Sequence, residues 1–281
     1  MTPWDELNFL LTNRIPRRLL TLWMGRLSKV RHPLVRVPAI GLWRMFCDVD
    51  LTDAEQPHFA SLHDAFTRAL RPGARPVDPD PAVLVSPCDG FVVASGVVTD
   101  GLLLQAKGLT YTLTQLLLDP QRAALHEGCA YVTLRLTAGM YHRFHAPTDC
   151  HVGLVRYISG DTWNVNPPAL RRIAQLYCRN ERAVIEAKGP GGDLTLVPVA
   201  AVLVASIRLR FANVLLHLRY RGANPIACSA RLAKGEEMGW FEHGSTIIVL
   251  LPAGSTLTDR TATGSRLRMG EPLARLPYSA A

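Results

Sequence analysis

The sequence lacks several features that would assign it at once to a large class of proteins. Its six cysteines are scattered, with no Cys-x-x-Cys pair and no zinc-ligand spacing, so we expect neither a disulfide scaffold nor a metal site. The longest apolar stretch, residues 196–207, contains Pro198 and falls short of the roughly 20 residues of a membrane-spanning helix. It predicts a pair of buried strands. Asp5 and Glu6 precede any apolar run, so no secretory signal peptide is visible.

Acidic residues are missing from one long stretch near the amino terminus. Between Arg14 and Arg44 the charged side chains are all basic: Arg17, Arg18, Arg26, Lys29, Arg31 and Arg36. The whole chain carries a formal charge of +8 and has a pI of about 9.5, which favours an anionic partner. No nucleic-acid-binding motif accompanies the charge, so we expect no nucleic-acid partner.

The first 70 residues show helical periodicity. Apolar side chains recur three or four positions apart in four sets: Trp4, Leu7 and Leu11; Leu20, Trp23, Leu27 and Val30; Ile40, Trp43 and Phe46; and Phe59, Leu62, Phe66 and Leu70. Pro38 is expected to open the third helix and Arg71-Pro72-Gly73 to end the fourth. The second set lies on a helix beginning near Arg17, whose basic flanks suit a membrane interface. A packed helix with a solvated basic face explains the pattern equally well.

From about residue 83 the periodicity changes to alternation, as in Val132, Leu134 and Leu136, which predicts strands. The predicted fold class is therefore α+β, with amino-terminal amphipathic helices followed by a β-rich single-domain core. We place a helical, membrane-associating region at residues 1–70 and a catalytic domain at residues 71–281. The Pro- and Asp-rich stretch 71–81 joins them.

Three short segments together supply the parts of an activated hydroxyl. Residues 85–90 contain Asp89, residues 141–147 contain His142 and His145, and residues 239–246 contain Ser245 preceded by a glycine. In such a set the hydroxyl is the nucleophile, the histidine is the base that takes its proton, and the carboxylate orients the histidine. Each segment also has a structural explanation, such as an Asp-Gly turn. The co-occurrence of all three favours chemistry.

These segments resemble those of the pyruvoyl-dependent phosphatidylserine decarboxylases, above all the bacterial membrane-associated type. The resemblance covers nearly the whole chain. The shared segments, in order, are Arg71-Pro72, residues 83–90, residues 104–108, residues 111–113, Tyr141-His142-Arg143 with His145 and Pro147, residues 165–167, residues 179–182, residues 234–239 with Phe241, and residues 244–246.

The resemblance implies a self-cleavage triad of Asp89, His145 and Ser245. The chain would cut itself between Gly244 and Ser245, leaving a β chain of residues 1–244 and an α chain of residues 245–281. Ser245 would become a pyruvoyl group, the cofactor in place of pyridoxal phosphate or a metal. That group would form a Schiff base with the amine of phosphatidylserine and release CO2, giving phosphatidylethanolamine.

Further roles follow from the same resemblance. His142 is the candidate proton donor after CO2 loss, and Asn164, Val165 and Asn166 are candidate contacts of the lipid headgroup. The implied partners are phosphatidylserine in an anionic membrane and the α and β chains of one precursor, assembled as a homodimer of processed pairs. The implied location is peripheral, on the cytoplasmic face of the cell membrane.

The sequence departs from the family pattern at Cys88, where alanine is usual, at His243, where many members have leucine, and at Asn164, where serine is usual. Three alternatives stay open. The first is a serine hydrolase acting in trans, although Ser245 lacks a Gly-x-Ser-x-Gly elbow. The second is a non-enzymatic membrane-binding protein, and the third is a pyruvoyl-dependent decarboxylase of another amine.

Overall fold

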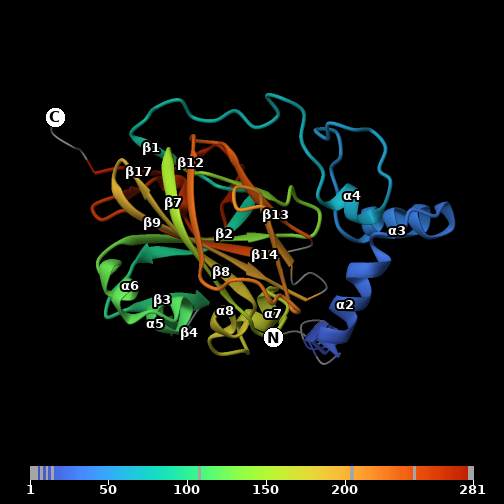
Figure 1. Ribbon diagram of the computed structural model, residues 1–281, viewed down its shortest axis with the longest axis horizontal. Helices are drawn as coiled ribbons and strands as arrows, with labels where there is room; N and C mark the ends of the chain where they lie inside the picture. Colours follow the sequence, from blue (N-terminus) through green and yellow to red (C-terminus); the bar gives the residue numbers. More distant parts are fainter. Residues whose placement is uncertain are drawn as a thin grey trace.

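The computed structural model describes residues 6, 9–10, 12–13, 16–106, 109–202, 206–242 and 245–277. Amino-terminal helices precede a β-rich core, which confirms the α+β prediction (Figure 1). The helical region contains α2 (Arg17–Leu27), α3 (Pro33–Phe46) and α4 (Leu62–Phe66). Among the described residues, no helix is long and apolar enough to cross a membrane.

The helices differ from the prediction in two places. The helix expected to open at Pro38 begins at Pro33, because proline suits the first helical turn and the His32 side chain accepts the Leu34 N–H. Pro38 therefore lies inside α3. The helix expected through Phe59 and Leu70 spans only five residues, since Ser61 caps its start and Leu70 forms a β-bridge with Ala54.

The apolar set of Trp4, Leu7 and Leu11 lies outside the described residues. The helix expected near Arg17 begins there.

The core is built on an eight-stranded antiparallel sheet. Its strands, in spatial order, are β12 (Ile226–Leu232), β7 (Cys150–Ile158), β8 (Arg182–Gly189), β9 (Gly192–Ala200), β14 (Ser245–Leu250), β5 (Ala130–Leu136), β2 (Gly90–Val97) and β16 (Arg266–Leu267). The apolar run 196–207 ends β9 and enters β10, as predicted.

Three smaller antiparallel sheets complete the core. One holds β11 (Val214–His217), β10 (Ser206–Leu209), β13 (Glu237–Phe241) and β6 (Arg143–His145); another holds β1 (Val83–Val85), β17 (Pro272–Arg275) and β15 (Thr256–Leu257); the third holds β3 (Leu102–Ala106) and β4 (Leu109–Thr112). The remaining helices are α5 (Leu113–Leu117), α6 (Pro120–Leu125), α7 (Pro167–Leu170), α8 (Leu176–Arg179) and the 3-10 turn η1 (Asp259–Thr261).

Both faces of the large sheet are buried along its central strands β5 and β14. One face packs against the sheet of β10 and β13, where Ile207 and Phe241 join the main core. The other face packs against α5, α7 and α8, where Leu116, Leu170 and Tyr177 form a second core. Residues of β14 alternate between these two cores, which explains why the strand carries no exposed polar side chain.

Helices α2 to α4 lie at one side of the core (Figure 1). A small cluster of Trp43, Ala65 and Phe66 holds α3 against α4. The indole N–H of Trp43 donates to the Ala138 carbonyl at 3.0 Å, which ties α3 to the end of β5. The helical region therefore lies next to the end of the sheet at which strand β5 finishes.

Candidate active site

The ends of four neighbouring strands bring the predicted site residues together. β14 begins at Ser245, opposite Leu136 at the end of β5 and Ala200 at the end of β9. β2 begins on the other side of β5, directly after Asp89. Antiparallel pairing therefore places Asp89 and Ser245 at the same end of the sheet, two strand spacings or about 10 Å apart.

Ser245 is completely buried at the start of β14. Within the part of the chain that the structure describes, its Oγ has no hydrogen-bond partner. A buried hydroxyl without a partner costs about 1–3 kcal/mol, so this arrangement fits a group held for a reaction. Gly244, the other half of the predicted cleavage site, and the neighbouring His243 lie outside the described residues.

His145 has the protonation pattern of a base. Its Nδ1 lies 2.9 Å from the Gly235 carbonyl oxygen, which can only accept, so Nδ1 carries the ring proton. The Tyr141 hydroxyl lies 3.0 Å from Nε2 and donates to it. Burial lowers the pKa of His145 below its ordinary value, although the Gly235 carbonyl works in the opposite direction. The imidazole is therefore neutral at pH 7 and able to take up a proton.

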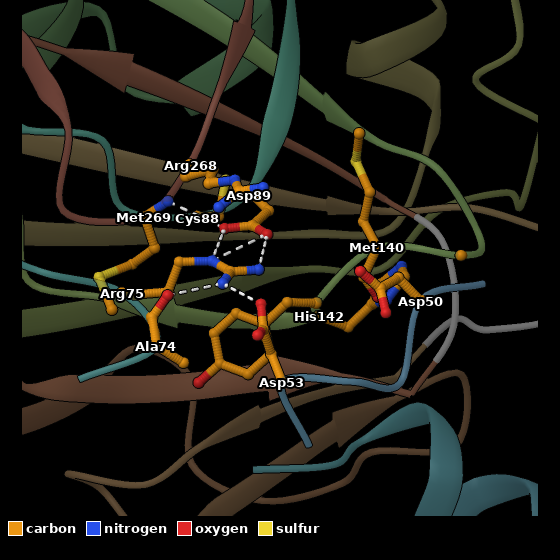
Figure 2. A network of polar contacts seen from close by, with 12 residues as sticks. Asp50, Asp53, Ala74, Arg75, Cys88, Asp89, Met140, His142, Arg268 and Met269 are labelled. Atoms are coloured by element: carbon orange, nitrogen blue, oxygen red, sulfur yellow. Dashed lines mark hydrogen bonds and ion pairs between the residues drawn. The ribbon is translucent and has the colours of Figure 1, made fainter. Parts of the chain in front are cut away.

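Asp89 is held by an arginine from the joint between the two regions. Arg75 donates from Nε to Oδ1 at 2.9 Å and from Nη2 to Oδ2 at 2.7 Å, and the Met269 N–H donates to Oδ1 at 2.9 Å (Figure 2). Arg75 Nη1 also contacts Asp53 Oδ2 at 2.9 Å. Burial acts to lower the pKa of Arg75, but the contacts with Asp89 and Asp53 outweigh it and raise that pKa.

Because Asp89 is buried, the Arg75 contact is what makes its negative charge tolerable. The contact with Asp53 also connects the carboxylate to the loop that follows α3.

Asp89 and Ser245 lie at one end of the large sheet and His145 lies on β6 beside the Asp89 loop, but the three predicted triad residues do not form a hydrogen-bonded chain. The His145 N–H donates to the Pro87 carbonyl at 2.8 Å, which places the histidine beside the Asp89 loop. Within the described residues, however, the side chains of Asp89 and His145 bond to Arg75, Tyr141 and the Gly235 carbonyl, and not to each other or to Ser245. For His145 to act on Ser245, its Nε2 must exchange the Tyr141 hydroxyl for Oγ.

His142 is fully buried between the helical region and the core. Its ring packs on Phe66 of α4, with a centroid separation of 4.0 Å, and its Nδ1 donates to the Met140 carbonyl at 2.8 Å. The Phe241 N–H donates to the His142 carbonyl at 3.0 Å, joining this residue to β13. His142 thus contacts both α4, through Phe66, and the strand β13 that precedes Ser245, through Phe241.

The segment before Ser245 is itself tied to the helices. Glu242, three residues ahead of Ser245, is largely buried. Lys29, two residues after α2, has its Nζ 3.2 Å from Glu242 Oε2, and His63 Nε2 of α4 lies 3.8 Å from Oε1. The helical region and the predicted cleavage segment therefore share a charged contact.

A pocket of about 540 Å³ opens at this end of the sheet, between the helices and the core. Apolar side chains of α2, α3 and α4 form one wall. Residues 135–138, 164–166 and 201–202 form the other wall. Leu136 in this lining is the register partner of Ser245, so the pocket reaches the row of the predicted nucleophile.

The predicted headgroup contacts Asn164, Val165 and Asn166 all line this pocket. Their polar groups also make local bonds. Asn166 Oδ1 accepts the Ala169 N–H and caps α7, while Asn164 Oδ1 accepts the Asn166 N–H. Asn180 holds the same loop in place by donating to the Trp163 and Ala200 carbonyls. The structure thus places the three residues at the pocket and gives the asparagines a structural role there.

Sequence reasoning missed the partners that hold these groups. Arg75 gives no signal because it lies in a stretch that reads as a joint. Gly235 acts through its carbonyl, which no side-chain pattern reveals. Tyr141 was detectable, since it precedes His145 by four residues within a segment already singled out. Among the described residues, no group of three or more His, Cys, Asp or Glu side chains is arranged to hold a metal ion.

Comparison with known proteins connects this site to one family. A family model described as phosphatidylserine decarboxylase matches residues 62–275. The chain is 42% identical to the phosphatidylserine decarboxylase proenzyme of Halorhodospira halophila over 270 residues, covering 93% of this chain and 91% of the relative. It is 36% identical to the proenzyme of Bordetella pertussis over 290 residues, covering 99% of this chain and 97% of the relative. A mitochondrial proenzyme of Schizosaccharomyces pombe is 28% identical over 98% of this chain.

Proposed function

Since the chain belongs to the phosphatidylserine decarboxylase family, we propose that it cuts itself between Gly244 and Ser245 and then converts phosphatidylserine into phosphatidylethanolamine. The family is one of carboxy-lyases, so the chain is an enzyme that removes CO2. One observation carries the self-cleavage proposal. A buried serine hydroxyl, without a hydrogen-bond partner among the described residues, lies at the same end of the sheet as the Asp89–Arg75 ion pair, and the neutral His145 lies beside the Asp89 loop.

We propose that His145 removes the proton of Ser245 Oγ as that oxygen attacks the Gly244 carbonyl. The peptide nitrogen takes a proton and leaves, so the amide becomes an ester with no atom gained or lost. Loss of the Ser245 α-proton then expels the Gly244 carboxylate and leaves dehydroalanine at the new amino terminus. Water converts dehydroalanine into a pyruvoyl group and ammonia. Glycine before the serine leaves the attacked carbonyl unobstructed.

The site fits a pyruvoyl group at position 245. The side chain is small, buried and without a hydrogen-bond partner among the described residues, and it lies in the row that borders the pocket. Such a ketone supplies the electrophile for the lipid amine and the acceptor for the electrons released with CO2.

We assign the proton that replaces CO2 to His142. Its Nδ1 is occupied by the hydrogen bond to the Met140 carbonyl, so Nε2 is the ring nitrogen that would deliver the proton. The stacking of this ring on Phe66 fixes its plane. The closeness of His142 to the helices that line the pocket supports the assignment.

The proposal predicts two fragments and a reducible ketone. Purified protein should contain a chain of residues 1–244 and a chain of residues 245–281, because the Gly244–Ser245 bond is broken. Treatment with borohydride should add two hydrogens to the small fragment and abolish CO2 release from phosphatidylserine vesicles. Intact-mass spectrometry with a CO2 assay measures both. An active protein whose mass is that of one unbroken chain would overturn the proposal.

We further propose that residues 1–70 dock the enzyme on the cytoplasmic face of an anionic membrane, while residues 71–281 carry the catalysis. The support is an exposed apolar surface on α3, where Leu34 is 81% and Phe46 is 76% exposed. Basic residues of the stretch 14–44 flank it. α2 and α3 also line the pocket, so lipid tails could leave it directly into a bilayer. A homodimer of processed pairs is part of this proposal.

Membrane docking predicts a specific loss of vesicle binding. Replacing Leu34, Val37 and Phe46 with glutamine should lower binding to anionic vesicles more than about tenfold, since burying each apolar side chain contributes about 1.5–3 kcal/mol. Val97→Gln with Leu125→Gln is the matched control, because these exposed residues lie outside the helical region. Cosedimentation measures the difference. Equal binding by the two variants would contradict the docking surface.

A further inference from the structure

The pocket beside Ser245 is lined by one charged side chain among the residues that the structure describes. That side chain is Arg135, near the end of β5. Its backbone lies opposite Thr246, and the next residue, Leu136, lies opposite Ser245. The backbone of Arg135 therefore lies one position along the strand from the row of Ser245. Its side chain leaves the opposite face of the sheet from that of Ser245, and Arg135 and Leu136 both line the pocket at this strand end.

Arg135 is not neutralised by any side chain within the described ranges. Its Nε is buried and has no hydrogen-bond partner in the part of the chain that the structure describes, and its guanidinium carbon lies 5.9 Å from the ring centre of Phe91. Burial lowers the pKa of Arg135, which the nearby Tyr177 only partly offsets. A partly buried guanidinium without an anion is costly, and an apolar pocket with one such group is the usual form of a ligand site.

We propose that Arg135 binds the phosphate of the phospholipid substrate, an inference that rests on the proposed function. A guanidinium matches phosphate oxygens with two parallel hydrogen bonds. Phosphate is favoured over the substrate carboxylate for an energetic reason. A cation on the carboxylate stabilises the ground state and opposes the loss of CO2, whereas a cation on the phosphate binds substrate and transition state alike. In phosphatidylserine the phosphate lies a few bonds from the amine, close enough for both to occupy one pocket.

Arg135→Gln tests this in the mature, processed enzyme. With a water-soluble, short-chain phosphatidylserine, KM should rise about 10- to 100-fold because a charge-assisted hydrogen bond is lost, while kcat stays nearly unchanged. The KM of Arg135→Lys should fall between those of wild type and Arg135→Gln, since lysine keeps the positive charge but cannot make two parallel hydrogen bonds. Arg266→Gln is the matched control, because Arg266 is an exposed arginine of the same sheet outside the pocket lining.

Short-chain phosphatidylethanolamine separates phosphate from carboxylate, because it keeps the first and lacks the second. Its affinity, measured by calorimetry without turnover, should weaken in Arg135→Gln by about the same factor as KM rises. A KM increase with unchanged affinity for phosphatidylethanolamine would assign Arg135 to the carboxylate and overturn the phosphate proposal. Wild-type values in both assays would overturn any headgroup role.

The wild-type protein keeps this test separate from the proposed function. If wild type does not release CO2, the proposed function fails, and the calorimetric comparison still decides the role of Arg135. Self-cleavage of Arg135→Gln should proceed as in wild type, which shows that the variant folds.

Discussion

Replacing Ser245 with alanine is expected to leave a single uncut chain with no decarboxylase activity. In the proposed mechanism the Ser245 hydroxyl is the attacking group, and alanine offers no oxygen to form the ester through which the backbone would break. The substitution removes a buried oxygen that has no hydrogen-bond partner within the described ranges, so the fold should be as stable as wild type or slightly more stable. Denaturing gel mobility and intact mass report the cleavage, and thermal unfolding reports the fold.

The neighbouring strand position provides the control. Thr246→Val removes the next buried hydroxyl of β14 while keeping the side-chain shape. It should yield both fragments at nearly the wild-type rate. If the Ser245→Ala chain still broke at this junction, Ser245 would not be the nucleophile, and the mechanism proposed for the mature enzyme would lose its starting point.

The fold could be predicted where local pattern and tertiary structure agree. The helix beginning near Arg17 and the strands around residues 132–136 follow directly from apolar periodicity. Pro38 was misread because a proline can open a helix or lie within one, and the choice depended on a cap at His32 six residues upstream. The helix expected over Phe59–Leu70 was shortened because Leu70 pairs with Ala54, a tertiary contact that periodicity cannot show.

The site could be predicted in its residue types but not in its connections. Asp89, His145 and Ser245 belong to segments far apart in sequence, and the register of β2, β5 and β14 brings two of them to one end of the sheet. The hydrogen bonds that hold them come largely from groups without a sequence signal. The Gly235 carbonyl is a backbone atom, and Arg75 acquires its role only when the joint folds over Asp89.

The absence of a direct Asp89–His145 hydrogen bond bears on how self-cleavage starts. Tyr141 occupies Nε2 of the base, and Arg75 occupies the carboxylate. Neither contact joins the Asp89 and His145 side chains to each other or to Ser245. We infer that the reaction requires a local rearrangement at His145, while Arg75 holds the Asp89 carboxylate in place through their salt bridge. The energetic effect of Asp89 on the imidazolium is then electrostatic across a short gap.

Replacing His145 with alanine is expected to slow self-cleavage by at least about a hundredfold, which is the lower end of what a positioned general base contributes. The same base predicts the pH dependence. Burial lowers the pKa of His145, so the reactive neutral form persists through pH 7 and the cleavage rate should stay constant down to the ordinary imidazole value of about 6.5. The rate should fall only as the pH drops through the lowered pKa, because protonation then removes the base.

His142→Ala is the matched control for this variant, since it removes a second buried imidazole of the same segment. It should cut normally but release CO2 slowly, because we assign His142 to the proton transfer that follows decarboxylation. Time courses of cleavage from pH 5 to 8 on freshly made precursor, followed by CO2 assays on the cut material, separate the two roles. A His145→Ala chain that matures at the wild-type rate, or a wild-type rate that already declines above pH 7, would exclude His145 as the base. Loss of cleavage in both histidine variants would instead point to a shared structural role for the segment.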